Sequence, residues 1–199
     1  MLRALAIVVI VALTSPLAAD DFDCKFDEAV ARRLIAARTV AQLDAAYAKA
    51  RRDDVPVRAL YRSRRLQLHP TFDEEKRYLD SLPKRRDDLL CIYRLTYPGP
   101  IGESEAVTDT VYDMFERAAA IVKKRGLSYE QLLRMTLWTD GELAEIAWDW
   151  YQPALDADPK RVVAGIRRLT RKEQSQLCSG AIDGLSVAET AKLCRSEEY

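Results

Sequence analysis

The chain is poor in glycine and histidine, and both shortages restrict what it can be. None of its seven glycines precedes Gly99, so the first half has little access to left-handed backbone, and we expect regular structure with tight turns there. His69 is the only histidine, which leaves no partner for a histidine-based catalytic or metal site. The sequence also lacks a phosphate loop, a dinucleotide fingerprint and a G-x-S-x-G elbow. We therefore expect no cofactor and favour a role other than catalysis.

Long apolar runs are absent except at the amino end. Arg3 precedes an apolar run over residues 4–13, and the small residues Ala18 and Ala19 follow it. This layout predicts a secretory signal peptide over residues 1–19, cleaved after Ala19. A membrane-spanning helix needs about 20 apolar residues, so we expect no stable membrane anchor. The mature chain, residues 20–199, is expected to be secreted or periplasmic.

Neither sign of charge is in excess in this mature chain. Without Arg3 it holds 30 basic and 31 acidic residues. General binders of nucleic acid or of anionic membranes carry a basic excess, so we expect no nucleic-acid partner. Hydrophobic residues make up 48% of the sequence, which is enough for one folded domain.

Cysteines are few but even in number, which is typical of disulfides in an exported chain. We favour the pairs Cys24–Cys91 and Cys178–Cys194 among the three pairings that four cysteines allow. No two of them have the C-x₂-C spacing of a zinc site, so we expect no metal.

Helix signals are abundant along the whole chain. A hydroxyl residue followed three positions later by Glu or Gln forms a capping box, in which the two residues satisfy each other's free backbone N–H groups. Such pairs are Thr39/Gln42, Thr71/Glu74, Ser128/Gln131, Thr139/Glu142, Thr170/Glu173 and Ser186/Glu189. Apolar residues recur every three to four positions between them. The sequence predicts an all-α fold, a compact multi-helix bundle of about ten short helices stapled by two disulfides.

Individual helices follow from this spacing. We expect them near 26–38, 40–52, 54–69, 71–82, 88–97, 105–125, 129–138, 141–155, 159–169, 171–182 and 187–196. The proline- and glycine-rich loop over 98–104 is a possible subdivision of the single domain. The tetrapeptides that begin at Arg51 and Arg85 are 34 residues apart, the length of a tetratricopeptide unit, but the rest of that pattern is missing. Helical repeats therefore remain an alternative to a bundle.

The most unusual segment runs from Leu137 to Tyr151. All three tryptophans lie in it, together with four acids. Carboxylates beside aromatic rings can bind a cationic or sugar ligand, and two carboxylates can act in glycoside hydrolysis. The alternative is that the tryptophans belong to the core and the acids face solvent. The candidate binding surface comprises Trp138, Asp140, Glu142, Glu145, Trp148, Asp149 and Tyr151.

A second candidate is a basic run on the third expected helix. Arg58, Arg62 and Arg65 fall on one helical face, so they could dock an acidic protein. Nearby acids also allow a solvated face with ion pairs. Because no catalytic set stands out, we expect an exported, non-catalytic protein that binds another protein, for example an inhibitor or protective partner. The alternatives are a cell-wall hydrolase that uses Glu142 and Glu145, and a small-ligand carrier.

Overall fold

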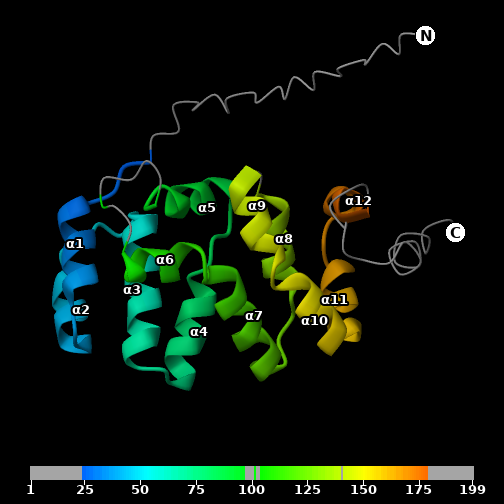
Figure 1. The fold of residues 1–199 in the computed structure, drawn as a ribbon, viewed down its shortest axis with the longest axis horizontal. Coiled ribbons are helices and arrows are strands. Elements are labelled where there is room, and N and C mark those ends of the chain that lie inside the picture. The colour runs from blue at the N-terminus through cyan, green and yellow to red at the C-terminus, as the bar shows by residue number, and fades with distance from the viewer. Residues whose placement is uncertain (1–23, 97–100, 102–103, 140, 179–199) are drawn as a thin grey trace, which may run out of the picture.

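The computed structural model describes residues 24–96, 101, 104–139 and 141–178, and their regular structure is entirely helical (Figure 1). This confirms the all-α prediction. The helices are α1 (Glu28–Ala36), α2 (Val40–Tyr47), α3 (Val55–Leu68), α4 (Phe72–Asp80), α5 (Arg86–Tyr93), α6 (Glu105–Val111), α7 (Met114–Arg125), α8 (Glu130–Leu137), α9 (Gly141–Trp148), α10 (Tyr151–Ala157), α11 (Pro159–Ile166) and α12 (Arg171–Cys178).

Helix α3 is the centre of the amino-terminal part. Helices α1, α2, α4, α5 and α6 all pack against it. Asp54 starts α3 by accepting hydrogen bonds from the backbone N–H groups of Val57 and Asp27, at 3.1 and 2.8 Å. Leu60 and Val57 are fully buried on its inner face. The segment before α1 and the start of α3 are therefore held by one carboxylate.

Helix α8 is the centre of the carboxy-terminal part, as α3 is of the amino-terminal part. It is contacted by α7, α9, α11 and α12. Figure 1 shows the elements following one another across the molecule from α1 and α2 at one end to α11 and α12 at the other. Gly165 lets α11 approach α8 closely, because a Cβ there would lie 3.2 Å from the backbone nitrogen of Glu130. The buried apolar side chains from Val30 to Leu177 form one cluster.

Two expected helices are each split in the structure. The helix expected over 105–125 breaks into α6 and α7 at Tyr112 and Asp113. The β-branched residues of α6 weaken helical preference before that break. The helix expected over 141–155 ends at Trp148, and α10 begins at Tyr151. Pro153 explains this second break, because proline fits the first turn of a helix but not its interior.

The disulfide Cys24–Cys91 is present, as expected, and joins the segment before α1 to α5 with a Cα–Cα distance of 5.5 Å. The second expected pair, Cys178–Cys194, lies outside the residues whose side chains are described, as do the signal peptide and the capping box at Ser186. Helix α6, which follows the 98–104 loop, packs against α3.

Candidate functional site

A groove lies where α3, α4 and the start of α5 meet. Its volume is about 430 Å³. We call it the α3–α4 groove. Its lining residues are Arg58, Arg62, Arg77, Asp80, Ser81, Leu82, Lys84 and Asp88. Four cationic side chains therefore face two carboxylates across a concave surface.

Both carboxylates of the α3–α4 groove are paired with cations outside its lining. Asp80 accepts from Lys76 at 2.8 Å, and Asp88 accepts from Arg85 at the same distance. The side chains of Arg58 and Lys84, in contrast, have no hydrogen-bond or ion-pair partner among the described residues. The groove thus presents uncompensated positive charge in a recess, where an anion would be attracted most strongly.

One buried carboxylate orders the cationic wall of the groove. The side chain of Glu74 is 3% exposed and accepts from Arg65 and Arg77, each at 2.8 Å. The Nη1 atom of Arg62 is 3.9 Å from the same carboxylate. A buried charge needs such partners, since unpaired burial is unfavourable. One carboxylate cannot neutralise three guanidinium groups, so the cluster keeps a net positive charge. Arg62 and Arg77 place part of this charge at the groove, because both line it.

Only two of the three arginines of the predicted basic patch therefore line the groove. Arg58 and Arg62 line the groove, whereas Arg65 lies in the network beside it. Arg65 also donates to Asp44 and to the hydroxyl of Tyr61, and its hydrogen bond holds the pKa of the Asp44 carboxyl below its usual value. The ring of Tyr61 stacks on Tyr47, with ring centroids 4.0 Å apart. These contacts fix α2, α3 and α4 relative to one another.

Sequence reasoning missed two of the four cations. Arg77 is on α4 and Lys84 follows Pro83 in the next loop, so neither shares a helical face with Arg58. The only local signal was Arg77 three positions after Glu74, a spacing that allows an ion pair. Their meeting with α3 depends on how α4 packs.

The aromatic segment near α9 and α10 is mostly internal. Trp150 and Tyr151 are buried, and their rings meet edge to face with centroids 5.7 Å apart. Trp150 also stacks on the buried Tyr129 and donates its indole N–H to the Thr136 hydroxyl at 3.1 Å. Burial raises the pKa of Tyr151 to about 12. These rings form part of the core between α8 and α10.

The other predicted surface residues are dispersed around this core. Trp138 and Trp148 are half-buried, while Glu145 and Asp149 are exposed. Asp149 follows the end of α9, so it does not continue the helical face of Glu145. Asp140 and the side chain of Glu142 lie outside the described residues. A small pocket of about 230 Å³ opens beside Asp149 and Trp150, lined mainly by apolar atoms of α7 and α10.

Other site types find little support in the described part of the chain. His69 is exposed at the end of α3, where its backbone N–H donates to the Arg65 carbonyl. No group of three or more potential metal ligands occurs among the described residues. None of the described helices is both long enough and apolar enough to cross a membrane.

Comparisons with protein-family models, curated proteins and solved structures found no match to the chain. A function must therefore be argued from the geometry of the sites themselves.

Proposed function

We propose that this protein is an exported binding protein that receives an acidic segment of another protein in the α3–α4 groove. The observation that carries the proposal is the pair Arg58 and Lys84, two cations in a recess with no partner among the described residues. A partner carboxylate placed there would gain charge-assisted hydrogen bonds, which are stronger than neutral ones. Positive potential in the recess would also speed association with an acidic partner.

The rigid setting of the groove supports a binding role. Arg62 and Arg77 are pre-ordered by Glu74, so less side-chain freedom is lost when a partner binds. Asp80 and Asp88 are held by Lys76 and Arg85, which limits their repulsion of an incoming acid. An inhibitor or protective partner needs such a preformed surface and no catalytic group.

Export is the second part of the proposal. The disulfide Cys24–Cys91 is compatible with an oxidising compartment, and the amino-terminal pattern is that of a cleaved signal peptide. We include the pair Cys178–Cys194 in the proposed exported form, so that all four cysteines are in disulfides. The purified mature protein should then show no titratable thiol after denaturation without reductant.

The groove is tested with oxidised protein comprising residues 20–199. Partners are captured from native envelope extract, and the retained protein is purified and its affinity measured. The double variant Arg58→Gln/Lys84→Gln should weaken binding by about a hundred-fold, because each of the two lost charged hydrogen bonds is worth about 1.5 kcal/mol. The matched control, Arg33→Gln/Lys49→Gln, removes one exposed charge from α1 and one from the turn after α2. Equal affinity of both variants would rule out the groove.

The small-ligand carrier remains a second candidate, because the pocket beside Trp150 is lined mainly by apolar atoms. A ligand there should change tryptophan fluorescence in a screen of envelope metabolites, and a silent screen would count against it. The hydrolase alternative has its own test. Separate Glu142→Gln and Glu145→Gln variants should each abolish cell-wall lysis with the fold intact, and full activity in both would remove that alternative.

A further inference from the structure

The end of the molecule formed by α11 and α12 carries an unusual concentration of positive charge. Residues 159–172 contain six Lys or Arg residues and no acid. Arg161 pairs with Asp158 at 2.7 Å. The other five cations are exposed and have no described partner. They form what we call the α11–α12 basic face, namely Lys160, Arg167, Arg168, Arg171 and Lys172.

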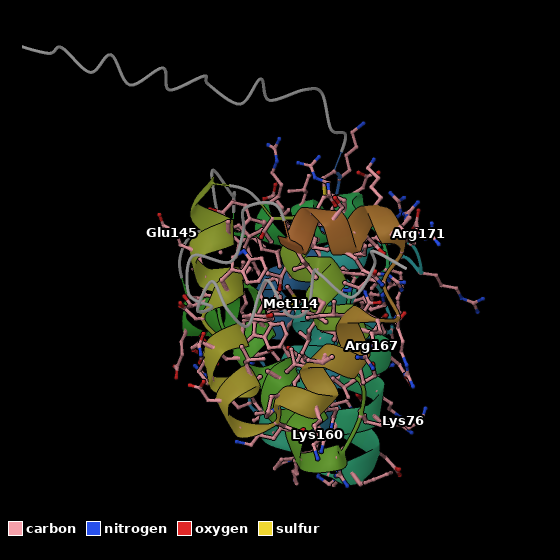
Figure 2. The ribbon with its side chains drawn as sticks, turned by 90° about the vertical axis from the view of Figure 1, so that its right-hand side faces the viewer. Lys76, Met114, Glu145, Lys160, Arg167 and Arg171 are labelled. Atoms are coloured by element: carbon pink, nitrogen blue, oxygen red, sulfur yellow. A yellow bond between two sulfur atoms is a disulfide. The ribbon has the colours of Figure 1, made fainter. Side chains whose placement is uncertain are left out.

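Three of these cations share one side of the molecule. Figure 2 shows Lys160, Arg167 and Arg171 along the side that faces the viewer, whereas Glu145 lies at the left edge. Along α11, Lys160 and Arg167 are about 10 Å apart, given a rise of 1.5 Å per residue. The nearest acid in the chain, Glu173, is already held by Arg134 and Thr170, at 3.2 and 2.7 Å. Within the described part of the chain, the acids that flank the basic face in sequence, Asp158 and Glu173, therefore already have partners of their own.

The positions of three of these cations are unfavourable for helix stability. Lys160 lies in the first turn of α11, and Arg171 and Lys172 open α12. The amino end of a helix carries partial positive charge, so cations are disfavoured there and acids are favoured. Glu173 is the only acidic residue in the first turn of α12, where an acid stabilises the helix. A role in binding explains these positions better than a role in folding.

We propose that the α11–α12 basic face docks the protein reversibly on an anionic phospholipid bilayer. A flat anionic surface can meet all five long side chains at once, which a compact ligand cannot do. The segment 159–177 contains no aromatic residue, so it lacks the stacking groups typical of single-strand nucleic-acid binding.

Adsorption rather than insertion is expected at this face. Among the described residues the exposed large hydrophobic side chains are Phe72 and Leu127, and both lie outside the face. Attraction is then mainly electrostatic and falls as salt is added. The net charge of the whole chain is near zero, so it does not attract the protein to an anionic membrane. At distances shorter than the screening length, however, the bilayer interacts with the local charge of the basic face.

The test measures partitioning of residues 20–199, oxidised, onto phosphatidylcholine vesicles with and without phosphatidylglycerol. The face variant combines Lys160→Gln, Arg167→Gln, Arg171→Gln and Lys172→Gln. Each charge near an anionic membrane changes the partition coefficient about five-fold, so the four substitutions of the face variant should together weaken binding by about several hundred-fold. The matched control combines Arg33→Gln, Arg38→Gln, Lys49→Gln and Arg52→Gln, which lie in or near α1 and α2 at the opposite end.

Thermal unfolding supplies a second readout. Because three of the substitutions remove cations from first turns, the face variant should melt no lower than the wild type. The pair Arg167→Glu/Arg168→Glu, outside those turns, should also abolish vesicle binding. Equal losses in the face and control variants would overturn the proposal in favour of a net-charge effect. Failure of the wild type to prefer phosphatidylglycerol vesicles would overturn it as well.

Discussion

At the scale of single residues, two adjacent buried carboxylates on α4 serve different neighbours. Glu74 turns to the arginines of α3, and Glu75 accepts from Lys124 at 2.7 Å and from Arg125, both on α7. Successive helix positions point in directions about 100° apart, so one turn of α4 can hold α3 on one side and α7 on the other. The ion pairs thereby connect the amino-terminal and carboxy-terminal parts.

Replacement of Glu75 by Gln should remove a pH-dependent part of stability. Its hydrogen bonds to Lys124 and Arg125 lower its pKa below the usual 4.5. That stabilisation is present above pH 4.5 and is lost as the pH falls through the lowered pKa of the folded state. Glu75→Gln should cost about 2 kcal/mol in the free energy of unfolding near pH 7, and less in acid. Denaturant titrations across this range measure the difference.

The matched control for this prediction is Asp80→Asn, which removes the exposed pair with Lys76. An exposed pair contributes about 0.5 kcal/mol, so its loss should be small. A difference between wild type and Glu75→Gln that stays constant down to acid pH would contradict the assignment of the pH dependence to this carboxylate.

Thr136 is expected to stabilise the aromatic core through its hydroxyl. The hydroxyl donates to the Leu132 carbonyl at 2.9 Å and accepts the indole N–H of Trp150. Thr136→Val keeps the shape but leaves that buried N–H unpaired, so it should cost about 1–3 kcal/mol of unfolding free energy. Thr136→Ser keeps the hydroxyl and should cost about 1 kcal/mol or less. Chemical unfolding measures both variants, and a Thr136→Val variant as stable as the wild type would contradict a stabilising role for the hydroxyl.

The capping boxes show which residue-level signals can be read from sequence. The Thr170/Glu173 box is complete, since Glu173 N–H donates to the Thr170 hydroxyl and Thr170 N–H donates back to the carboxylate. Thr71 also caps α4, but the Glu74 carboxylate turns to Arg65 instead of closing the box. The cap formed by the hydroxyl residue can be predicted from the sequence. The partner of the Glu side chain cannot, because it depends on which cations the tertiary fold places nearby.

At the scale of helices, the sequence predicted most starts and missed two breaks. Asp54 and Thr39 cap α3 and α2 as expected, because a cap depends on residues three positions away. The break before α10 was also readable, from Pro153. The β-branched residues of α6 are only a weak signal for the break between α6 and α7, which depends on α6 packing on α3 while α7 packs on α8. For the same reason the spacing within α3 identified Arg58 and Arg62 but not the cations on α4 and its loop.

The contact between α8 and α11 should depend on Gly165. A Cβ at this position would lie 3.1 Å from Leu133 Cδ1 and 3.2 Å from the Glu130 backbone nitrogen. Gly165→Ala gains about 1 kcal/mol of helical preference but forces the two helices apart, and we expect a net loss of about 1–2 kcal/mol in stability. Thermal unfolding measures it, with the exposed Ala164→Ser as control. Stabilisation by Gly165→Ala would show that α11 can shift without loss.

The disulfide joins elements that are distant in sequence, so it should act chiefly on the unfolded chain. Cys24 and Cys91 are 67 residues apart, and closing a loop of that length is worth about 4 kcal/mol in the chain-entropy model. The double variant Cys24→Ser/Cys91→Ser should lose about this much unfolding free energy while keeping its helical circular dichroism. An unchanged free energy of unfolding would contradict the loop-closure argument.

At the scale of the whole molecule, balanced charge conceals an uneven distribution. The α3–α4 groove and the α11–α12 basic face are both cationic, and exposed acids such as Glu145 and Asp149 lie elsewhere. Composition therefore excluded a uniformly basic protein, but it could not locate local clusters that depend on the packing of several helices. The two cationic regions are also separable by mutation, since they lie on different helices.

One continuous core should make the chain unfold as a unit. Buried apolar side chains from α1 to α12 belong to a single cluster, and the ion pairs of Glu75 link α4 to α7. All three tryptophans lie between residues 138 and 150, so their fluorescence reports the carboxy-terminal part, whereas far-ultraviolet circular dichroism reports every helix. The two denaturation curves should therefore coincide. Tryptophan fluorescence that changes at a different denaturant concentration would mean that the parts centred on α3 and α8 unfold separately, with the boundary between α6 and α7.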